Sequence, residues 1–448
     1  MNTASFETGN SQALALARII STQVEVIIAE YTAAGQSLPS LHSTTVGPFD
    51  TPERSSANLS KAIQVIEGAC AQLCATVASP GHVVTNFEEP ASMLVVVNGK
   101  IADLLLDRPE GVHVDELAKQ AKLDSGKLGR ILRLLATKHC FTEVKPNVFA
   151  NNRLSMKLVS TDPVSSLVGH MTDEAQKSSA FLADTLADPR LGPSMLPEDA
   201  SFKQVHGYSL FDYYKTGEGK ERTDRFAQAM VGWAEVTGGG MLPKVYPWES
   251  LPEDTTICDV GGGNGHATLA LVKAFPKFKI ILQDLPDVVN QGKDYWKKEI
   301  PDAVDKQRIE FVPLDFFADS PVKDSDFYYI RHVLHDWPHN ECIKILTNVR
   351  KALGPTSKLL IHEFVLQHLV RDPEQATLVG QAPEPLLPNY GVGRMRLYQQ
   401  DINMMNLVNS KERTLPEFIE MGKETGFEFV KMWDSGEAAL LEFRPVTV

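Results

Sequence analysis

Short apolar runs alternate with helical stretches over the second half of the chain. We expect strands there at residues 256–260, 279–283, 309–313, 327–331, 358–363, 427–433 and 438–443. Strands that alternate with helices are typical of a doubly wound parallel sheet. The last two runs leave no room for a helix between them, so we expect them to pair as an antiparallel hairpin at one edge of that sheet.

The first half of the chain has a mostly helical pattern. Apolar residues recur at helical spacing in residues 11–31, 59–78 and 90–106, and a stretch rich in Ser, Thr, Pro and Gly separates the first two as a linker or exposed loop. Residues 114–121 and 125–137 predict a helix, a turn and a second helix. Two short strands near 141–144 and 148–151 should follow, and this order predicts a winged helix.

We divide the chain into four segments from these patterns. They are an N-terminal helix with a flexible linker (1–58), a helical and winged-helix domain (59–165), a helical connector (166–248) and an α/β domain (249–448). A chain of 448 residues is long enough for two or three domains with large cores.

Composition and charge narrow the possible partners. The net charge of −13 disfavours polyanions, and we find neither a basic leader nor an apolar run long enough to cross a bilayer, so we expect a cytoplasmic protein with no membrane partner. The five cysteines are scattered and include no CxxC pair, which indicates neither a disulfide framework nor a zinc site. No cluster of acidic residues and histidines suggests a metal, and we expect none.

The predicted winged helix leaves two alternatives open. Residues 111–160 contain nine Lys or Arg against four Asp or Glu, and Lys127, Arg130 and Arg133 lie near one face of the second helix. DNA contact is therefore physically possible. The other interpretation is dimerisation, which we favour because a winged helix joined to a small-molecule domain often serves only as a scaffold. We expect no nucleic-acid partner.

A glycine-rich loop follows the first strand of the α/β domain, in the sequence ICDVGGGNGH. Glycines at such a turn let the backbone approach a ligand closely. The dinucleotide fingerprint is incomplete, because His266 stands where a third glycine or an alanine is expected. Asp284 ends the second strand and Asp315 follows the third, positions suited to ribose and adenine. With no basic cluster for a pyrophosphate, the pattern favours an adenosyl compound.

These motifs carry a resemblance to a known family. DVGGGNGHATLAL, QDLPDVV, PLDFF, RHVLHDWP, HEFVL and SKERT, in this order and at this spacing, resemble the S-adenosylmethionine (SAM)-dependent O-methyltransferases of the plant caffeic-acid and flavonoid type and their fungal polyketide-pathway relatives. The resemblance covers roughly residues 90 to 448. It implies a Rossmann-like SAM methyltransferase fold with an N-terminal helical and winged-helix dimerisation domain, hence a homodimer.

The resemblance also implies the cofactor contacts. They are Asp259, Gly261, Gly263, Asp284, Leu285, Asp315, Phe316 and Arg331. Arg331 stands where the plant enzymes of that family have a lysine in the cofactor site. The positive charge is therefore kept, but the geometry of the charged group differs.

Methyl transfer to a phenol needs a base, because a phenol with a pKa near ~10 is hardly ionised at neutral pH. His335 lies just past the fourth strand, and the family uses the equivalent histidine as general base. By the resemblance, Glu363 and Glu412 flank this histidine and hold its tautomer. His332 should point elsewhere if the strand continues, as a packed or hydrogen-bonded residue.

The resemblance further suggests a pocket for an aromatic or polyketide-type substrate. Its expected residues are His206, Phe211, Met230, Trp233, Asp336, Met404 and Met405. Core packing is the alternative for the methionines and aromatic residues, and holding the loop before residue 339 is the alternative for Asp336. Two segments depart from the plant enzymes: residues 366–401, which could form a lid or a surface insertion, and the N-terminal 80 residues.

Three functions are compatible with these observations. The first is O-methylation of a phenolic or enolic hydroxyl of a secondary metabolite. The second is a SAM-binding dehydratase or pericyclase without net methyl transfer, which some fungal relatives represent. In the relatives of that kind whose motifs can be compared, the histidine of HDW tends to be lost, whereas His335 is intact here. A DNA-binding SAM sensor is the third.

Overall fold

A computed structural model gives the structure of the chain and describes residues 9–77, 90–152, 154–372 and 378–446. By their contacts these residues form two compact units. The helical unit lies within residues 1–192, 201–236 and 382–393, and the sheet unit within 193–200, 237–381 and 394–448. The boundaries of the four segments predicted above remain a prediction.

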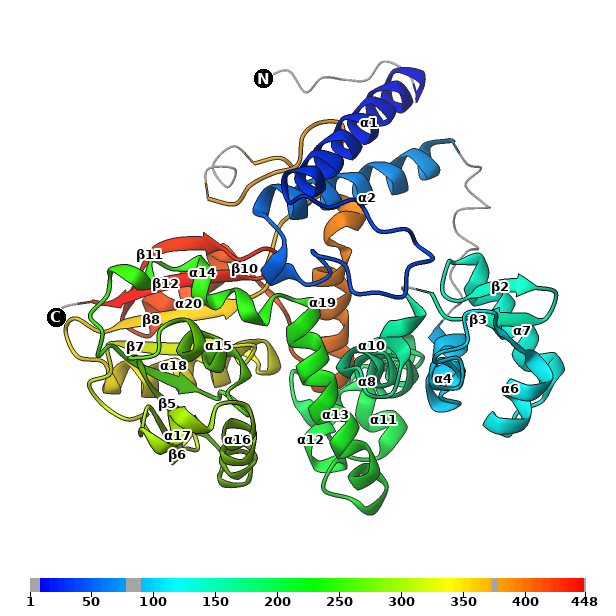
Figure 1. Ribbon diagram of the computed structural model, residues 1–448. Coiled ribbons are helices and arrows are strands. Elements are labelled where there is room, and N and C mark those ends of the chain that lie inside the picture. Colours follow the sequence, from blue (N-terminus) through cyan, green and yellow to red (C-terminus); the bar gives the residue numbers. More distant parts are fainter. Residues whose placement is uncertain (1–8, 78–89, 153, 373–377, 447–448) are drawn as a thin grey trace. The chain divides into compact units, whose positions relative to one another are not determined.

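A seven-stranded sheet forms the centre of the sheet unit, in the order β11-β12-β8-β7-β4-β5-β6 (Figure 1). Its strands are β4 (Thr256–Val260), β5 (Lys279–Asp284), β6 (Ile309–Pro313), β7 (Phe327–Arg331), β8 (Lys358–Glu363), β11 (Phe427–Asp434) and β12 (Ala439–Pro445). Five strands run parallel, and β11 and β12 form the antiparallel hairpin at one edge, as predicted.

Helices cover both faces of this sheet because its parallel strands are apolar on both sides. They are α14 (Leu242–Val245), α15 (His266–Ala274), α16 (Pro286–Glu299), α17 (Pro301–Asp305), α18 (His339–Ala352) and α20 (Leu415–Glu424). A further helix of the same unit is α19 (Met395–Val408). One buried cluster joins the sheet to α18 and α20, and a second joins it to α14, α15 and α16. A short parallel pair, β9 (Val365–Leu366) and β10 (Arg413–Thr414), was not predicted.

The helical unit contains the winged helix. Its elements up to residue 150 are α1 (Gly9–Ala33), α2 (Ala57–Val77), α4 (Pro90–Asn98), α5 (Ile101–Leu104), β1 (Val112–His113), α6 (Val114–Ala121), α7 (Ser125–Thr137), β2 (Thr142–Lys145) and β3 (Val148–Ala150). The three strands pair in the order β1-β3-β2. The predicted helix 90–106 is broken, because Lys100 adopts a left-handed conformation with φ 49° between α4 and α5. Ala78, the end of the predicted helix 59–78, lies outside the described residues.

The connector is a series of further helices. They are α8 (Pro163–His170), α9 (Gln176–Ser179), α10 (Leu182–Ala187), α11 (Ser201–His206), α12 (Leu210–Tyr213) and α13 (Gly217–Val236), and a π-helical turn at Met171–Ala175 joins α8 to α9. These helices bring the two buried acids Asp173 and Glu174 against Arg225, which donates to both carboxylates at 2.6 Å.

Parts of the two segments that depart from the plant enzymes pack against each other within the helical unit. Residues 382–393, which we name the strap, come from the long connection 366–401 and lie on the α1–α2 pair. Leu386 and Tyr390 share an apolar cluster with Leu16 and Val65. The contact is close, because a Cβ added to Gly68 would lie 2.3 Å from the carbonyl oxygen of Tyr390. The connection is therefore neither a free lid nor a bare surface insertion over these residues; its part 373–377 lies outside the described residues.

Helix α1 is strongly apolar along its length. By length and composition alone it is a candidate membrane span, with a mean hydropathy of 1.4 over 18 residues. The expectation that no apolar run is long enough to cross a bilayer was therefore wrong for this helix. In the structure α1 packs along α2, with Leu16 fully buried between them and the strap.

Candidate active site

The glycine loop lies at the carboxyl ends of the parallel strands, between β4 and α15. Gly261, Gly263 and Gly265 have φ of 68°, 60° and 78°, a region that suits glycine. A Cβ on Gly262 would lie 2.4 Å from the Leu282 side chain, so no larger residue fits there, whereas a Cβ on Gly263 would meet no atom within 4 Å. The loop therefore packs tightly on the sheet below and leaves open space beside Gly263.

Asp259 and Asp284, both predicted to contact the cofactor, have different roles in the structure. Asp259 is buried and accepts a hydrogen bond from the Thr268 hydroxyl at 2.7 Å. Asp284 accepts from the backbone N–H groups of Gly263 at 2.9 Å and Leu285 at 2.7 Å. Burial raises the pKa of both carboxyls, that of Asp259 to about 7. Asp259 thus anchors the loop from within, and Asp284 shapes the loop edge.

An aromatic wall borders the loop on the side of β6 and β7. Asp315 is exposed after β6, and the neighbouring Phe316 packs edge to face with Trp337 at 6.3 Å between ring centroids. A Cβ on Gly261 would lie 3.3 Å from the Phe316 ring. Leu285 is 54% exposed and offers an apolar surface that a flat ring can cover.

Arg331 ends β7 with part of its guanidinium unpartnered. Its Nη1 donates to Nε2 of His266 at 3.2 Å. Its Nε and Nη2 are buried and have no hydrogen-bond partner in the described part of the chain. Buried cationic donors without a partner are costly, so they indicate a site for an anionic or acceptor ligand. Together with the glycine cradle and Asp284, they fit a nucleoside that bears an amino-acid carboxylate, as SAM does.

His335 lies in a turn after β7, surrounded by carboxylates. Its Nδ1 lies 2.7 Å from Oε1 of Glu412 and 3.9 Å from Oε2 of Glu363, and its Nε2 lies 3.6 Å from Asp336. Glu363, at the end of β8, accepts hydrogen bonds from the backbone N–H groups of Val333 and Leu334, both at 2.9 Å. The structure thus brings together the three catalytic candidates predicted from the sequence, and Glu363 also holds the turn that carries His335.

Charge sets the protonation of this imidazole. Burial alone would lower the pKa of His335, but the carboxylates of Glu412, Asp336 and Glu363 outweigh it and raise the pKa to about 10. Burial raises the pKa of Asp336 to about 6 despite the nearby imidazole. His335 is therefore a much stronger base than a free histidine, with a proton affinity close to that of a phenolate.

The sequence predicted that His332 points away from the site, but in the structure it points toward His335. The strand ends at Arg331, and His332 adopts φ 49°, so the chain turns and sets its ring 5.1 Å from that of His335. Neither of its ring nitrogens has a hydrogen-bond partner among the described residues. His332, His335 and Glu363 place possible ligand atoms within 4.8 Å of one another, a grouping that can hold a metal ion. Our expectation that no metal is required stays a prediction.

Two residues that support the turn and loop around His335 were not predicted from the sequence. Arg413 is fully buried and donates to the backbone carbonyls of Leu334 and Trp337, both at 2.7 Å, so it fixes the turn around His335. Asp401, on α19, accepts from the Glu412 backbone N–H at 2.8 Å. Arg413 is part of the SKERT motif, but an arginine among other charged residues is equally compatible with an exposed, solvated surface.

The expected substrate residues divide between the two units. Met404 and Met405 lie on α19 in the sheet unit, with Asp336 beside His335. His206, Phe211, Met230 and Trp233 lie on α11, α12 and α13 in the helical unit. Within that unit His206 packs on Phe202 at 4.3 Å between ring centroids. Their shared role in one pocket stays a prediction.

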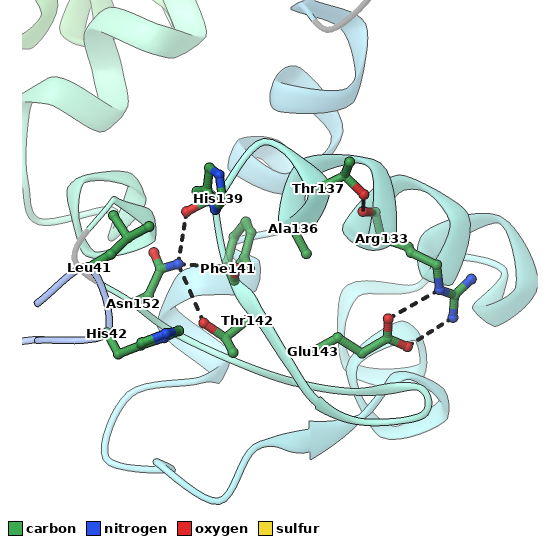
Figure 2. Close-up of a pocket in the computed structure, with 10 residues that line it drawn as sticks. All are labelled: Leu41, His42, Arg133, Ala136, Thr137, His139, Phe141, Thr142, Glu143 and Asn152. Carbon is green, nitrogen blue, oxygen red and sulfur yellow. Dashed lines mark hydrogen bonds and ion pairs between the residues drawn. The ribbon is translucent and has the colours of Figure 1, made fainter. Parts of the chain in front are cut away.

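A separate pocket of about 300 Å³ lies in the winged helix. Figure 2 shows it beside the end of α7, with His42 of the linker at one side. None of the predicted site residues lines it. Arg133, one of the three cations considered for DNA contact, forms a two-pronged ion pair there with Glu143 at 3.2 and 3.0 Å. This side chain is engaged within its own domain, which weakens the case for DNA contact.

Comparison with known proteins agrees with this fold. The model of the O-methyltransferase domain family matches residues 184–428. The chain is 51% identical to "3-O-methyltransferase 2" of Phanerochaete chrysosporium over 96% of both chains, and 32% identical to O-methyltransferase tpcA of Aspergillus fumigatus over 96% of both. The crystal structure of human N-acetylserotonin methyltransferase with SAM shares the fold, with a TM-score of 0.65, 20% identity and coverage of 83% of this chain and 99% of that one.

The fold and the site therefore define a SAM-dependent enzyme that methylates oxygen on a small molecule. The chain belongs to the O-methyltransferase family. The resemblance inferred from the sequence motifs is confirmed, as is the Rossmann-like α/β fold with an N-terminal helical domain. The comparisons favour methyl transfer over the dehydratase or pericyclase alternative.

Proposed function

We propose that His335 is the general base of this enzyme and that the acceptor is a phenolic or enolic hydroxyl of a secondary metabolite. The observation that carries the proposal is the 2.7 Å contact between Nδ1 of His335 and Oε1 of Glu412. A carboxylate can only accept, so Nδ1 keeps the hydrogen and Nε2 is the nitrogen that can take a proton.

The chemistry of each residue follows from this arrangement. When bound, SAM supplies a methyl carbon that its sulfonium makes electrophilic. Nε2 of His335 removes the hydroxyl proton of the acceptor, so that the oxygen attacks with its full charge. Glu412 stabilises the imidazolium that forms, and Glu363 and Arg413 hold the turn in place. A base of this kind contributes about 10² to 10⁴ in rate, and alignment of the reacting atoms supplies most of the rest.

The cofactor assignment extends to individual residues. Asp284 would bind the ribose hydroxyls, Leu285 and Phe316 would cover the adenine, and Asp315 would bind its amino group. Gly261 and Gly263 would let the backbone approach, and Asp259 would act from beneath the loop through Thr268. Arg331 would bind the amino-acid end, which its unpartnered nitrogens support.

Two observations support the proposed substrate class: the names of relatives and the apolar side chains near the site. Relatives of this chain are named "3-O-methyltransferase 2", "4-O-methyltransferase 1" and "Sterigmatocystin 8-O-methyltransferase", and each name gives a numbered oxygen as the methylated position. Met404 and Met405 on α19 would offer an adaptable apolar lining for a planar ring system. We propose a polyketide-type or other aromatic metabolite.

The assembly and location are also proposals. We propose a homodimer joined through the N-terminal helices and the winged helix, in the cytoplasm, without a membrane or nucleic-acid partner. Light scattering on the purified protein should give twice the mass of one chain, and duplex DNA should not be retained at low salt.

A direct assay tests the proposed function. Purified protein is incubated with SAM and a panel of phenols and enols, and products are followed by mass spectrometry. We expect S-adenosylhomocysteine and a methylated product in equal amounts. Turnover of an acceptor with a change in its skeleton and no S-adenosylhomocysteine would instead support the dehydratase or pericyclase alternative.

A further inference from the structure

We propose that His266 is a positioning residue of the cofactor site, which holds the Arg331 guanidinium by one nitrogen and thereby presents the opposite edge to a carboxylate. The incomplete glycine fingerprint thus has a specific purpose, because the histidine that replaces the third small residue is the residue that touches Arg331. The inference rests on the proposed role of Arg331 in binding the cofactor and adds the chemical group that it recognises.

The hydrogen bonds of His266 determine its tautomer. Its Nδ1 lies 2.9 Å from Oδ1 of Asn264, an atom that only accepts, so Nδ1 carries the hydrogen. Nε2 therefore has a free lone pair, and it accepts from Nη1 of Arg331 at 3.2 Å. Burial and the nearby Arg331 lower the pKa of His266 to about 3, which keeps the ring neutral and able to accept.

The loop gives His266 a rigid support. Oδ1 of Asn264 also accepts from the backbone N–H of His266 at 3.2 Å, and the Asn264 carbonyl accepts from the Trp296 indole at 3.1 Å. A Cβ on Gly265 would lie 2.5 Å from the same indole nitrogen. The chain of contacts from Trp296 to Arg331 therefore has little freedom, and the guanidinium is oriented before any ligand binds.

The free edge of the guanidinium identifies the ligand group. Nε and Nη2 lie on one side of this planar group, both are buried, and neither has a partner among the residues that the structure describes. Two parallel N–H donors match the two oxygens of a carboxylate, and a lysine cannot make this two-point contact. The amino-acid end of SAM carries such a carboxylate. His266 and Arg331 would thus select for that end of the cofactor.

The test compares two ligands that differ in this group. S-adenosylhomocysteine carries the carboxylate, whereas 5′-methylthioadenosine has the same nucleoside without the amino-acid end. Calorimetry on the full chain, without acceptor, measures both affinities for the wild type and for His266→Ala, His266→Gln and Arg331→Lys. His339→Ala serves as a matched control, because His339 lies in an exposed pair with Glu424.

We expect His266→Ala and Arg331→Lys to weaken S-adenosylhomocysteine binding about ten- to a hundredfold and to leave 5′-methylthioadenosine unchanged. His266→Gln should recover part of the loss, because its amide oxygen can accept from Arg331. Equal weakening of both ligands by His266→Ala, or no weakening of either, would overturn the inference. If His266→Ala does not fold, His266→Phe, which keeps a ring but offers no acceptor to Arg331, provides the same comparison.

Failure of the cofactor site and failure of this inference give different results. A wild type that binds neither ligand would overturn the whole cofactor assignment. A wild type that binds both equally well would overturn only the carboxylate contact. Methyl transfer is not measured, so the outcome does not depend on the role of His335.

Discussion

Nδ1 of His335 lies 2.7 Å from Oε1 of Glu412, although 77 residues separate the two in the chain. His335 follows the central strand β7, and Glu412 precedes β10, which pairs with β9 directly after β8. The short turn after β7 and the β9–β10 pair beside β8 therefore place a base and its carboxylate in contact. This relationship makes Glu412 the residue that most directly controls the strength of the base.

Glu412→Gln should lower kcat about ten- to a hundredfold at high pH, where the His335 ring is neutral in both the wild type and the variant. The amide keeps the shape but removes the charge that raises the pKa of His335 and stabilises the imidazolium. S-adenosylhomocysteine affinity should not change, because Glu412 is not a proposed cofactor contact. Glu420→Gln, an exposed position on α20, is the control and should retain activity. Wild-type kcat in Glu412→Gln would contradict the role given to this carboxylate.

Activity should rise with pH. The raised pKa of His335, about 10, means that the ring is protonated in the free protein at neutral pH, and only the neutral ring can accept a proton. The neutral fraction grows about tenfold per pH unit below that pKa, and kcat/KM for the acceptor should follow it. A cationic ligand beside the ring should lower this pKa.

Histidine NMR can check both parts of this prediction. The His335 signal should titrate at lower pH with the cationic SAM analogue sinefungin bound than with neutral-sulfur S-adenosylhomocysteine. A ring that titrates at the ordinary pKa of about 6.5 in the ligand-free protein, with a flat pH–rate profile above it, would be incompatible with the carboxylate-raised base.

Much of the sheet unit could be predicted from the sequence. Strands β4, β7 and β8 are buried on both faces and give short apolar runs in the sequence. The bounds predicted for these strands and for the edge strand β6 match the structure to the residue. The residue at which β7 ends decides where the His332 ring lies. The apolar pattern cannot show that His332 adopts a left-handed conformation, and that one dihedral angle turns its ring toward His335.

Other features depend on contacts between distant residues. The sequence shows His266 only as a missing glycine, and the contact with Arg331 requires the loop and β7 to lie side by side. Arg413 appears as a surface charge until the turn at Leu334 folds over it. The strap could not be predicted either, because its apolar residues meet α1 and α2 only in the folded helical unit.

Gly68→Ala should loosen the strap. Its new Cβ would lie 2.3 Å from the Tyr390 carbonyl oxygen, so residues 382–393 must shift away from α2. Hydrogen exchange of the strap should become faster, while exchange of the central sheet should not. Gly217→Ala is the matched control in the same unit, since a Cβ there meets no atom within 4 Å. Unchanged strap exchange in Gly68→Ala would contradict this packing.

Removal of metal should leave turnover unchanged. His332, His335 and Glu363 can hold an ion, but a metal on His335 would compete for the imidazole that must accept the proton. Prolonged treatment with EDTA, followed by assay in metal-free buffer, should therefore give the untreated rate. Loss of activity that added Zn²⁺ or Mg²⁺ restores would show that the reaction needs a metal and that the base mechanism is incomplete.

A single-turnover assay of His335→Gln tests the central claim most directly. The variant, loaded with saturating SAM and acceptor, should transfer methyl at least about a hundredfold more slowly than the wild type, because it lacks the imidazole nitrogen that takes the proton. Its affinity for S-adenosylhomocysteine should be unchanged, which shows that the site is folded. Methyl transfer at the wild-type rate by His335→Gln would contradict the claim that this imidazole is the base.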